Sequence, residues 1–248
     1  MKILAIDSSG MPASAAVLEG GVLLAEYTVN FQKTHSQTLV PMLEEIKRAL
    51  DLDLNTLDAV AVAGGPGSFT GLRIGSATAK GIGLALGRML IHVPTLEALA
   101  CNFYGSDCLI APMMDARREQ VFAGIYTFCA EQETEVSLRI LMDQAPVNVT
   151  DLCTRLNRLS EETGKRVILL GDGARTYEDI LEECLKAPHF YAQAHLSQQS
   201  AGSVAVRAME LARMGRMESA ARHRPEYLRV SQAERVRAQK EGSKKNAS

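Results

Sequence analysis

Two aspartates stand where a strand could carry a carboxylate to a binding cleft. Asp7 directly follows the apolar run 2–6, and Asp115 directly follows the apolar run 109–114. Carboxylates at such positions could hold a metal-bound phosphate, or they could accept hydrogen bonds from the N–H groups of a turn. The turn interpretation is the simpler of the two, and the local sequence leaves both open.

A glycine-rich turn between an apolar run and a helical segment is the next candidate. Residues 64–68, Gly-Gly-Pro-Gly-Ser, have the general form of a phosphate cradle, in which N–H groups at a helix start bind an anion. The turn lacks the Lys-Ser/Thr pair of a Walker A loop, the register of a GxGxxG fingerprint and the GxSxG pattern of an esterase elbow. We therefore do not expect Ser68 to act as a nucleophile.

The histidines and cysteines form no metal-binding motif along the chain. Two imidazoles share one helical face when they are three or four residues apart, and no two histidines have this spacing. The five cysteines include no CxxC pair, which indicates reduced thiols rather than a disulfide framework. We expect no metal site from this pattern. The histidines are His35, His92, His189, His195 and His223.

The composition is that of a globular protein with a large core. The chain has 248 residues, 46% of them hydrophobic, and a net charge of −2. No segment approaches the roughly 18 apolar residues of a membrane span, and the N-terminus does not resemble a secretion signal, so we expect a cytoplasmic protein. The segment 222–248 is the exception, because its basic residues outnumber its acidic ones. It is either a solvated tail, unstructured in its last part, or a contact for RNA.

The order of expected elements in the first half is repeated in the second. Three antiparallel strands, a helix, a buried strand and a glycine-rich helix are expected at 2–6, 14–18, 22–29, 39–50, 59–63 and from Ser68 onward. The same order follows at 109–114, 121–128, 137–142, 150–162, 167–170 and 177–185. This is the order of a ribonuclease H-like unit, so we predict an α/β protein of two similar lobes across a cleft. A last helix is expected at 200–214. Thr38 is the expected N-cap of the helix 39–50, since Pro41 would then lie in its first turn.

The glycine-rich helix carries small residues at a spacing of four. Gly71, Gly75, Ala79, Gly83 and Gly87 form one stripe, and a neighbouring stripe consists of Ala77, Gly81 and Ala85. Small side chains let another backbone come close, whether that of the chain's own sheet, of a second helix in the chain, or of another protein. The amphipathic helix 39–50 is the natural neighbour, and the two helices could form half of a four-helix interface.

Several segments together resemble one family. MKILAIDSS, HSQTLVPMLEEI, GGPGSFTGLRIG, MDARREQVF and PEYLR are similar to the TsaB (YeaZ) family of bacterial tRNA threonylcarbamoyladenosine (t6A) synthesis. The resemblance implies duplicated ribonuclease H-like lobes of the actin-like (ASKHA) superfamily, with mixed sheets flanked by helices. It also implies a non-catalytic scaffold that forms a heterodimer with its catalytic paralogue, a TsaD-type protein, through the two helices of the first lobe. With a TsaE-type ATPase, that complex would modify adenosine 37 of ANN-decoding tRNAs.

The resemblance also implies which residues act. The partner interface would include Leu39, Met42, Leu43, Ile46, Leu72, Gly75, Ser76, Ala79 and Gly83. A vestigial nucleotide cleft would include Asp7, Ser9, Asp115, Gly171 and Gly173. No catalytic residue, metal or firmly bound cofactor is implied for this chain, although ATP or ADP could bind at an interface of the complex.

Three segments bear on that cleft. The HMEGH-like segment that supplies metal ligands in the catalytic paralogue corresponds to residues 95–99, Thr-Leu-Glu-Ala-Leu, and both histidines are absent. Asp115 is followed by Ala-Arg-Arg-Glu where nucleotide-binding relatives have glycines, so long side chains occupy that turn. By contrast, LLGDGAR at 169–175 still resembles the adenosine-side motif.

We divide the chain into a first lobe with the partner-binding helices (1–103), a second lobe (104–221) and a basic tail (222–248). Without its partner, the same apolar surface could support a homodimer. Two other functions stay open. One is an ATP-binding ASKHA enzyme, an ATPase or a kinase-like protein; the other, less favoured, is a metallopeptidase.

Overall fold

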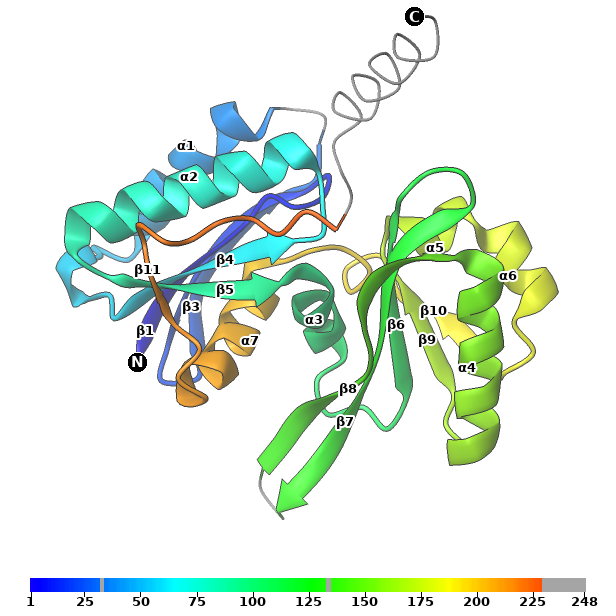
Figure 1. Cartoon of the computed structure of the whole chain (residues 1–248). Coiled ribbons are helices and arrows are strands. Elements are labelled where there is room, and N and C mark those ends of the chain that lie inside the picture. Colours follow the sequence, from blue (N-terminus) through cyan, green and yellow to red (C-terminus); the bar gives the residue numbers. More distant parts are fainter. Residues whose placement is uncertain (32–33, 133–134, 229–248) are drawn as a thin grey trace, which may run out of the picture.

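Two mixed sheets organise the chain, and a computed structural model describes residues 1–31, 34–132 and 135–228 (Figure 1). The first sheet has the order β11-β5-β4-β1-β2-β3. Its strands are β1 (Lys2–Asp7), β2 (Ala13–Glu19), β3 (Val22–Val29), β4 (Ala59–Gly65), β5 (Met89–Pro94) and β11 (Glu218–Ser219). The second sheet has the order β10-β9-β6-β7-β8. Its strands are β6 (Leu109–Asp115), β7 (Gln120–Gln132), β8 (Glu135–Asn148), β9 (Val167–Leu170) and β10 (His189–Tyr191).

The two sheets share one topology. In each, an antiparallel meander of three strands is extended by two parallel strands, giving β3-β2-β1-β4-β5 in one lobe and β8-β7-β6-β9-β10 in the other. This confirms the predicted α/β fold of duplicated ribonuclease H-like lobes, the actin-like (ASKHA) arrangement. The sequence analysis missed β5, β10 and β11. The mainly apolar run Met-Leu-Ile-His-Val-Pro at β5 was a signal that could have been used, whereas β10 and β11 are too short to give one.

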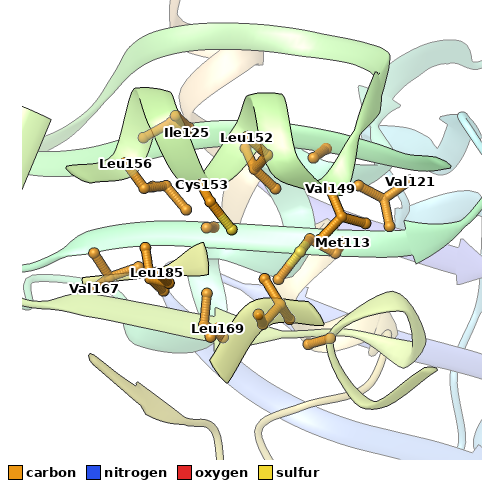
Figure 2. Packing of buried hydrophobic residues seen from close by; sticks show 14 of the residues in the cluster. Met113, Val121, Ile125, Val149, Leu152, Cys153, Leu156, Val167, Leu169 and Leu185 are labelled. Atoms are coloured by element: carbon orange, nitrogen blue, oxygen red, sulfur yellow. The ribbon is translucent and has the colours of Figure 1, made fainter. Parts of the chain in front are cut away.

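Helices cover both faces of each sheet. The α-helices are α1 (His35–Ala49), α2 (Phe69–Leu86), α3 (Thr95–Ala100), α4 (Val149–Thr163), α5 (Asp172–Thr176), α6 (Glu178–Cys184) and α7 (Ala201–Arg213). Helices α1 and α2 lie on one face of the first sheet and α7 lies on the other. Figure 2 shows Leu152, Cys153 and Leu156 of α4 packed on the second sheet. Among the described residues, no helix combines the length and apolar character needed to cross a bilayer.

Helix α3 lies between the lobes, and all six of its residues are buried. Leu96 and Leu99 belong to the apolar cluster of the second sheet, while Ala98 belongs to the cluster between the first sheet and α7. The carboxylate of Glu97 accepts a hydrogen bond of 2.7 Å from Nε of Arg207 on α7, and both side chains are buried. The segment 95–99 is therefore part of the core that joins the lobes.

Two boundaries differ from the sequence analysis. Helix α1 begins at His35 after Thr34, so Thr38 is not its N-cap and Pro41 lies in the helix interior. A proline there leaves the carbonyl of Gln37 without its helical donor. Because Gln37 and Pro41 are both exposed, that carbonyl can bond to water instead.

The second lobe is also shorter than the predicted 104–221. Helix α7 packs on β1 and β2, and β11 pairs with β5, so residues 201–219 complete the first lobe. Residues 220–228 continue across the same lobe, and the remainder of the predicted tail, 229–248, lies outside the described residues.

Three glycines of the first stripe on α2 are covered by the chain's own atoms, whereas Gly87 ends the helix with a φ of 63° and is exposed. Gly71, Gly75 and Gly83 are all buried. A Cβ on Gly71 would overlap the carbonyl oxygen of Ser8, and a Cβ on Gly75 would lie 2.5 Å from the Ser8 hydroxyl oxygen. At Gly83 it would overlap Leu90. These glycines thus allow α2 to lie directly on its own sheet and on the loop after β1.

Gly81 has no such neighbour: among the described residues, nothing lies within 4 Å of the position of its missing Cβ, and the residue is exposed. Substitution by alanine should change the free energy of unfolding in opposite directions at a buried glycine and at Gly81. We expect Gly71→Ala to lower the free energy of unfolding by about 1–3 kcal/mol, because the methyl group forces the backbone at Ser8 to shift. We expect Gly81→Ala to raise it by about 0.5–1 kcal/mol, because alanine is the better helix former. Urea unfolding of the two variants tests both signs, and equal effects would contradict this account of α2.

Candidate functional site

The loop after β1 is fixed to the start of α2. One carboxylate oxygen of Asp7 accepts hydrogen bonds from the backbone N–H of Ser9 at 2.8 Å and from its hydroxyl at 2.6 Å. Ser8 donates its hydroxyl to the carbonyl of Gly71 at 2.9 Å, and the N–H of Ser68 donates to the carbonyl of Ser9 at 2.7 Å. Ser68 also caps α2 by accepting from the N–H of Gly71. The local turn bonds predicted for Asp7 are present.

Burial makes the charge of Asp7 unfavourable. The side chain is 1% exposed, and desolvation raises its pKa to about 6 despite the two hydrogen bonds from Ser9. Within the described part of the chain, no lysine, arginine or histidine forms an ion pair with it. At neutral pH this carboxylate is charged inside the core and lowers the stability of the fold.

Gln199 covers the loop from the other side. It is buried, and a Cβ on Gly10 would lie 2.6 Å from its side-chain oxygen. The space next to the loop 7–10 is therefore filled by a side chain that enters from the segment before α7.

Asp115, Gly171 and Gly173 meet in the second lobe. The carboxylate of Asp172 accepts hydrogen bonds from the N–H of Asp115 at 3.3 Å and from the N–H of Gly173 at 3.0 Å. These bonds join the segment 169–175, which resembles the adenosine-side motif, to the end of β6. Gly171 has a φ of 91°, and a Cβ there would overlap the carbonyl of Met113. The glycines of this motif thus have a packing role within the lobe.

Tyr177 is a polar neighbour of this group that sequence reasoning missed. Its hydroxyl donates to Asp115 at 2.8 Å, and the N–H of Arg117 donates to the same carboxylate oxygen at 2.7 Å. The Arg117 guanidinium lies 3.5 Å from the other oxygen, so the carboxylate of Asp115 is held within its own turn. Nothing in the local sequence marks Tyr177, because the chain reaches Asp115 only through the packing of α5 on β6.

The turn after Asp115 has the backbone of a glycine turn with long side chains. Arg117, Arg118 and Glu119 have φ values of 68°, 56° and 57°, in the left-handed region that costs an ordinary residue about 1–2 kcal/mol. All three side chains are exposed. The structure therefore bears out the expectation that long side chains occupy this turn.

The predicted cleft residues form two groups rather than one. Asp7 and Ser9 are bonded to the start of α2, and Asp115 is bonded to the motif 171–173. No hydrogen bond or ion pair among the described residues joins Asp7 to Asp115. In each group the carboxylate accepts hydrogen bonds from neighbouring N–H and hydroxyl groups of the chain, which supports a packing role for both.

The residues predicted to contact a partner are mostly inaccessible. Leu43 is partly buried and the other eight are buried: Leu39, Met42, Ile46, Leu72, Gly75, Ser76, Ala79 and Gly83. As a set, they hold α1 and α2 on the sheet, and the prediction confused this inner face with the outer one. The solvent-facing side of α2 presents Ala77, Gly81, Leu84 and Ala85, which we call the small-residue face. Leu84 is 61% exposed, and on α1 the side chain of Val40 is 49% exposed.

Comparison with known proteins assigns these features to a family. The family model of TsaD, tRNA N6-adenosine threonylcarbamoyltransferase, matches residues 23–236. The chain is 33% identical over 237 residues to the tRNA threonylcarbamoyladenosine biosynthesis protein TsaB of Bacillus subtilis, covering 94% of this chain and 96% of that protein. It is also 33% identical over 129 residues to TsaB of Escherichia coli, covering 51% and 55%. Among solved structures, YeaZ from Pseudomonas aeruginosa superposes with a TM-score of 0.73 at 26% identity, covering 92% of this chain and 99% of that one.

The pKa of Asp7 leads to a test of its role in stability. In the unfolded chain this carboxyl loses its proton near the usual value of 3.8, whereas in the folded chain it keeps the proton until about 6. The contribution of Asp7 to stability therefore falls as the pH rises from about 4 to about 6 and then stays low. This pKa shift of about two units corresponds to a loss of folding stability of at most about 3 kcal/mol.

We expect Asp7→Asn to stabilise the protein by about 1–3 kcal/mol at pH 7, because its amide oxygen can accept both bonds from Ser9 without a charge. The gain should shrink toward pH 4. Urea unfolding of both proteins from pH 4 to pH 8 measures this difference. A gain that does not change with pH would contradict the shifted pKa.

Proposed function

Because the chain belongs to the TsaB (YeaZ) family, we propose that it takes part in tRNA t6A biosynthesis as a non-catalytic scaffold subunit. In this proposal it forms a heterodimer with a TsaD-type catalytic paralogue in the cytoplasm. The complex, with a TsaE-type ATPase, modifies adenosine 37 of ANN-decoding tRNAs. The tRNA is bound by the complex, and ATP or ADP binds at an interface of it.

The observation that carries the proposal is Gly81 of α2, a helical glycine for which packing within the chain gives no reason. A glycine in a helix interior costs about 1 kcal/mol relative to alanine. Gly71, Gly75 and Gly83 have a reason within the chain, since their missing Cβ atoms make room for the sheet and the loop after β1. Gly81 has no such reason within the described part of the chain, because it is exposed there and no atom lies within 4 Å of its missing Cβ. A partner helix that packs closely on the small-residue face supplies the missing reason.

Two observations support a role without chemistry. The segment 95–99, where the catalytic paralogue is expected to have metal ligands, is a buried helix with an ion pair between Glu97 and Arg207. Asp7 accepts hydrogen bonds within its own turn, Asp115 accepts them from its turn and from Tyr177, and Gln199 covers the loop after β1. The chain therefore supports its partner through shape, and when alone it could use the same face to form a homodimer.

The small-residue face can be tested directly. We expect Gly81→Leu and Ala77→Arg each to weaken binding to the TsaD-type paralogue at least about 30-fold. This corresponds to about 2 kcal/mol of binding free energy, the usual loss when a contact at the centre of an interface is disrupted. Size-exclusion chromatography of the mixed proteins, followed by calorimetry, measures the change.

Met214→Arg is the matched control, because Met214 is also exposed, at 61%, but lies beyond α7 on the other side of the first sheet. It should bind as the unchanged protein does. Urea unfolding should give the same midpoint for the control and the Ala77→Arg variant. Unchanged affinity in both α2 variants would rule out this face as the interface.

A further inference from the structure

Three potential metal ligands meet at the edge of the first sheet, away from both groups described above. His92 belongs to β5, Glu218 to β11, and His223 follows β11 by four residues. One ligand atom from each residue can be chosen so that all three lie within 4.8 Å of one another. Because β11 pairs with β5 through Glu218 and Leu90, the sheet itself brings these distant parts of the sequence together.

His223 has a nitrogen without a partner. Its side chain is 0% exposed, and its Nδ1 lies 2.8 Å from a carboxylate oxygen of Glu218. Its Nε2 is buried and forms no hydrogen bond with any described residue. A buried polar atom of this kind is uncommon in a native core, and it requires an explanation. The ring thus has one nitrogen beside a carboxylate and one buried nitrogen that has no partner among the described residues.

The chain also makes room for the ring of His92. A Cβ on Gly64 would overlap that imidazole, so only glycine at this position of β4 allows the ring to lie where it does. The rings of His92 and His223 are 5.6 Å apart between centroids.

We propose that His92, Glu218 and His223 form a binding site for a divalent transition metal ion of the zinc class. Two imidazoles and one carboxylate are a ligand set that suits Zn²⁺ and related ions, with a fourth position left for water. His92 and Glu218 are partly exposed, so an ion can reach the group from solvent.

A bound ion would hold the C-terminal segment on the first lobe. Residues 220–228 cross the face of the sheet beside α2 (Figure 1). Lys80 donates to the carbonyls of Ala221 and His223, and the N–H of Glu226 donates to the carbonyl of Gly64 at 2.7 Å. Coordination by His92 and His223 would add a further link between β5 and this segment, so the metal acts as a clamp rather than in catalysis.

Titration with Co²⁺ tests the site. The full chain, freed of any histidine tag and treated with a chelator, is titrated while the visible absorption of four-coordinate Co²⁺ is followed, and Zn²⁺ is then added as a competitor. We expect one ion per chain, displaced by Zn²⁺. Because His223 is buried and its replacement could unfold the protein, the variants are His92→Gln and Glu218→Gln. Each should weaken binding at least about tenfold.

His189→Gln is the matched control. His189 also lies beside a glutamate, with Nε2 at 3.3 Å from Glu182, but it is in the second lobe, and no group of three ligands among the described residues includes it. It should bind Co²⁺ as the unchanged protein does. Binding should also raise the urea midpoint of the unchanged chain and of the control, but not that of His92→Gln. Absence of Co²⁺ binding, or equal binding by His92→Gln and Glu218→Gln, would overturn the proposal.

Discussion

The contact between α2 and the loop after β1 is the constraint on which the first lobe depends. Gly71 lies so close to the carbonyl of Ser8 that no side chain fits between them, and the Ser8 hydroxyl bonds back to the carbonyl of Gly71. This contact sets the depth at which α2 lies on the sheet. It also decides which side of α2 faces inward, and therefore which side a partner can reach.

The two stripes of small residues on α2 have different physical reasons. The stripe with Gly71, Gly75 and Gly83 is needed for packing within the chain, because each missing Cβ leaves space that other atoms of the chain occupy. The neighbouring stripe with Gly81 leaves space that solvent occupies in the isolated chain. Spacing along a helix cannot distinguish these cases, since both stripes repeat every four residues. The distinction requires the position of the sheet.

Three titratable groups in the interior have different roles. Glu97 and Arg207 neutralise each other between α3 and α7, and so they stabilise the junction of the lobes only as a pair. Asp7 has no such partner, and its raised pKa shows that the fold bears the cost of its charge. The buried His223, with one nitrogen unpaired, is a third case, in which an ion from solvent would complete the set.

The sequence by itself determined most of the longer elements and their duplicated order, because periodicity and turns are local properties. The strand 167–170 was predicted correctly, as was the buried strand rich in alanine and valine at 59–63. Only the tertiary structure decided which face of α2 is free, that α7 belongs to the first lobe, and that His92 lies near His223. Each of these depends on contacts between residues far apart in the sequence, and no local pattern records such contacts.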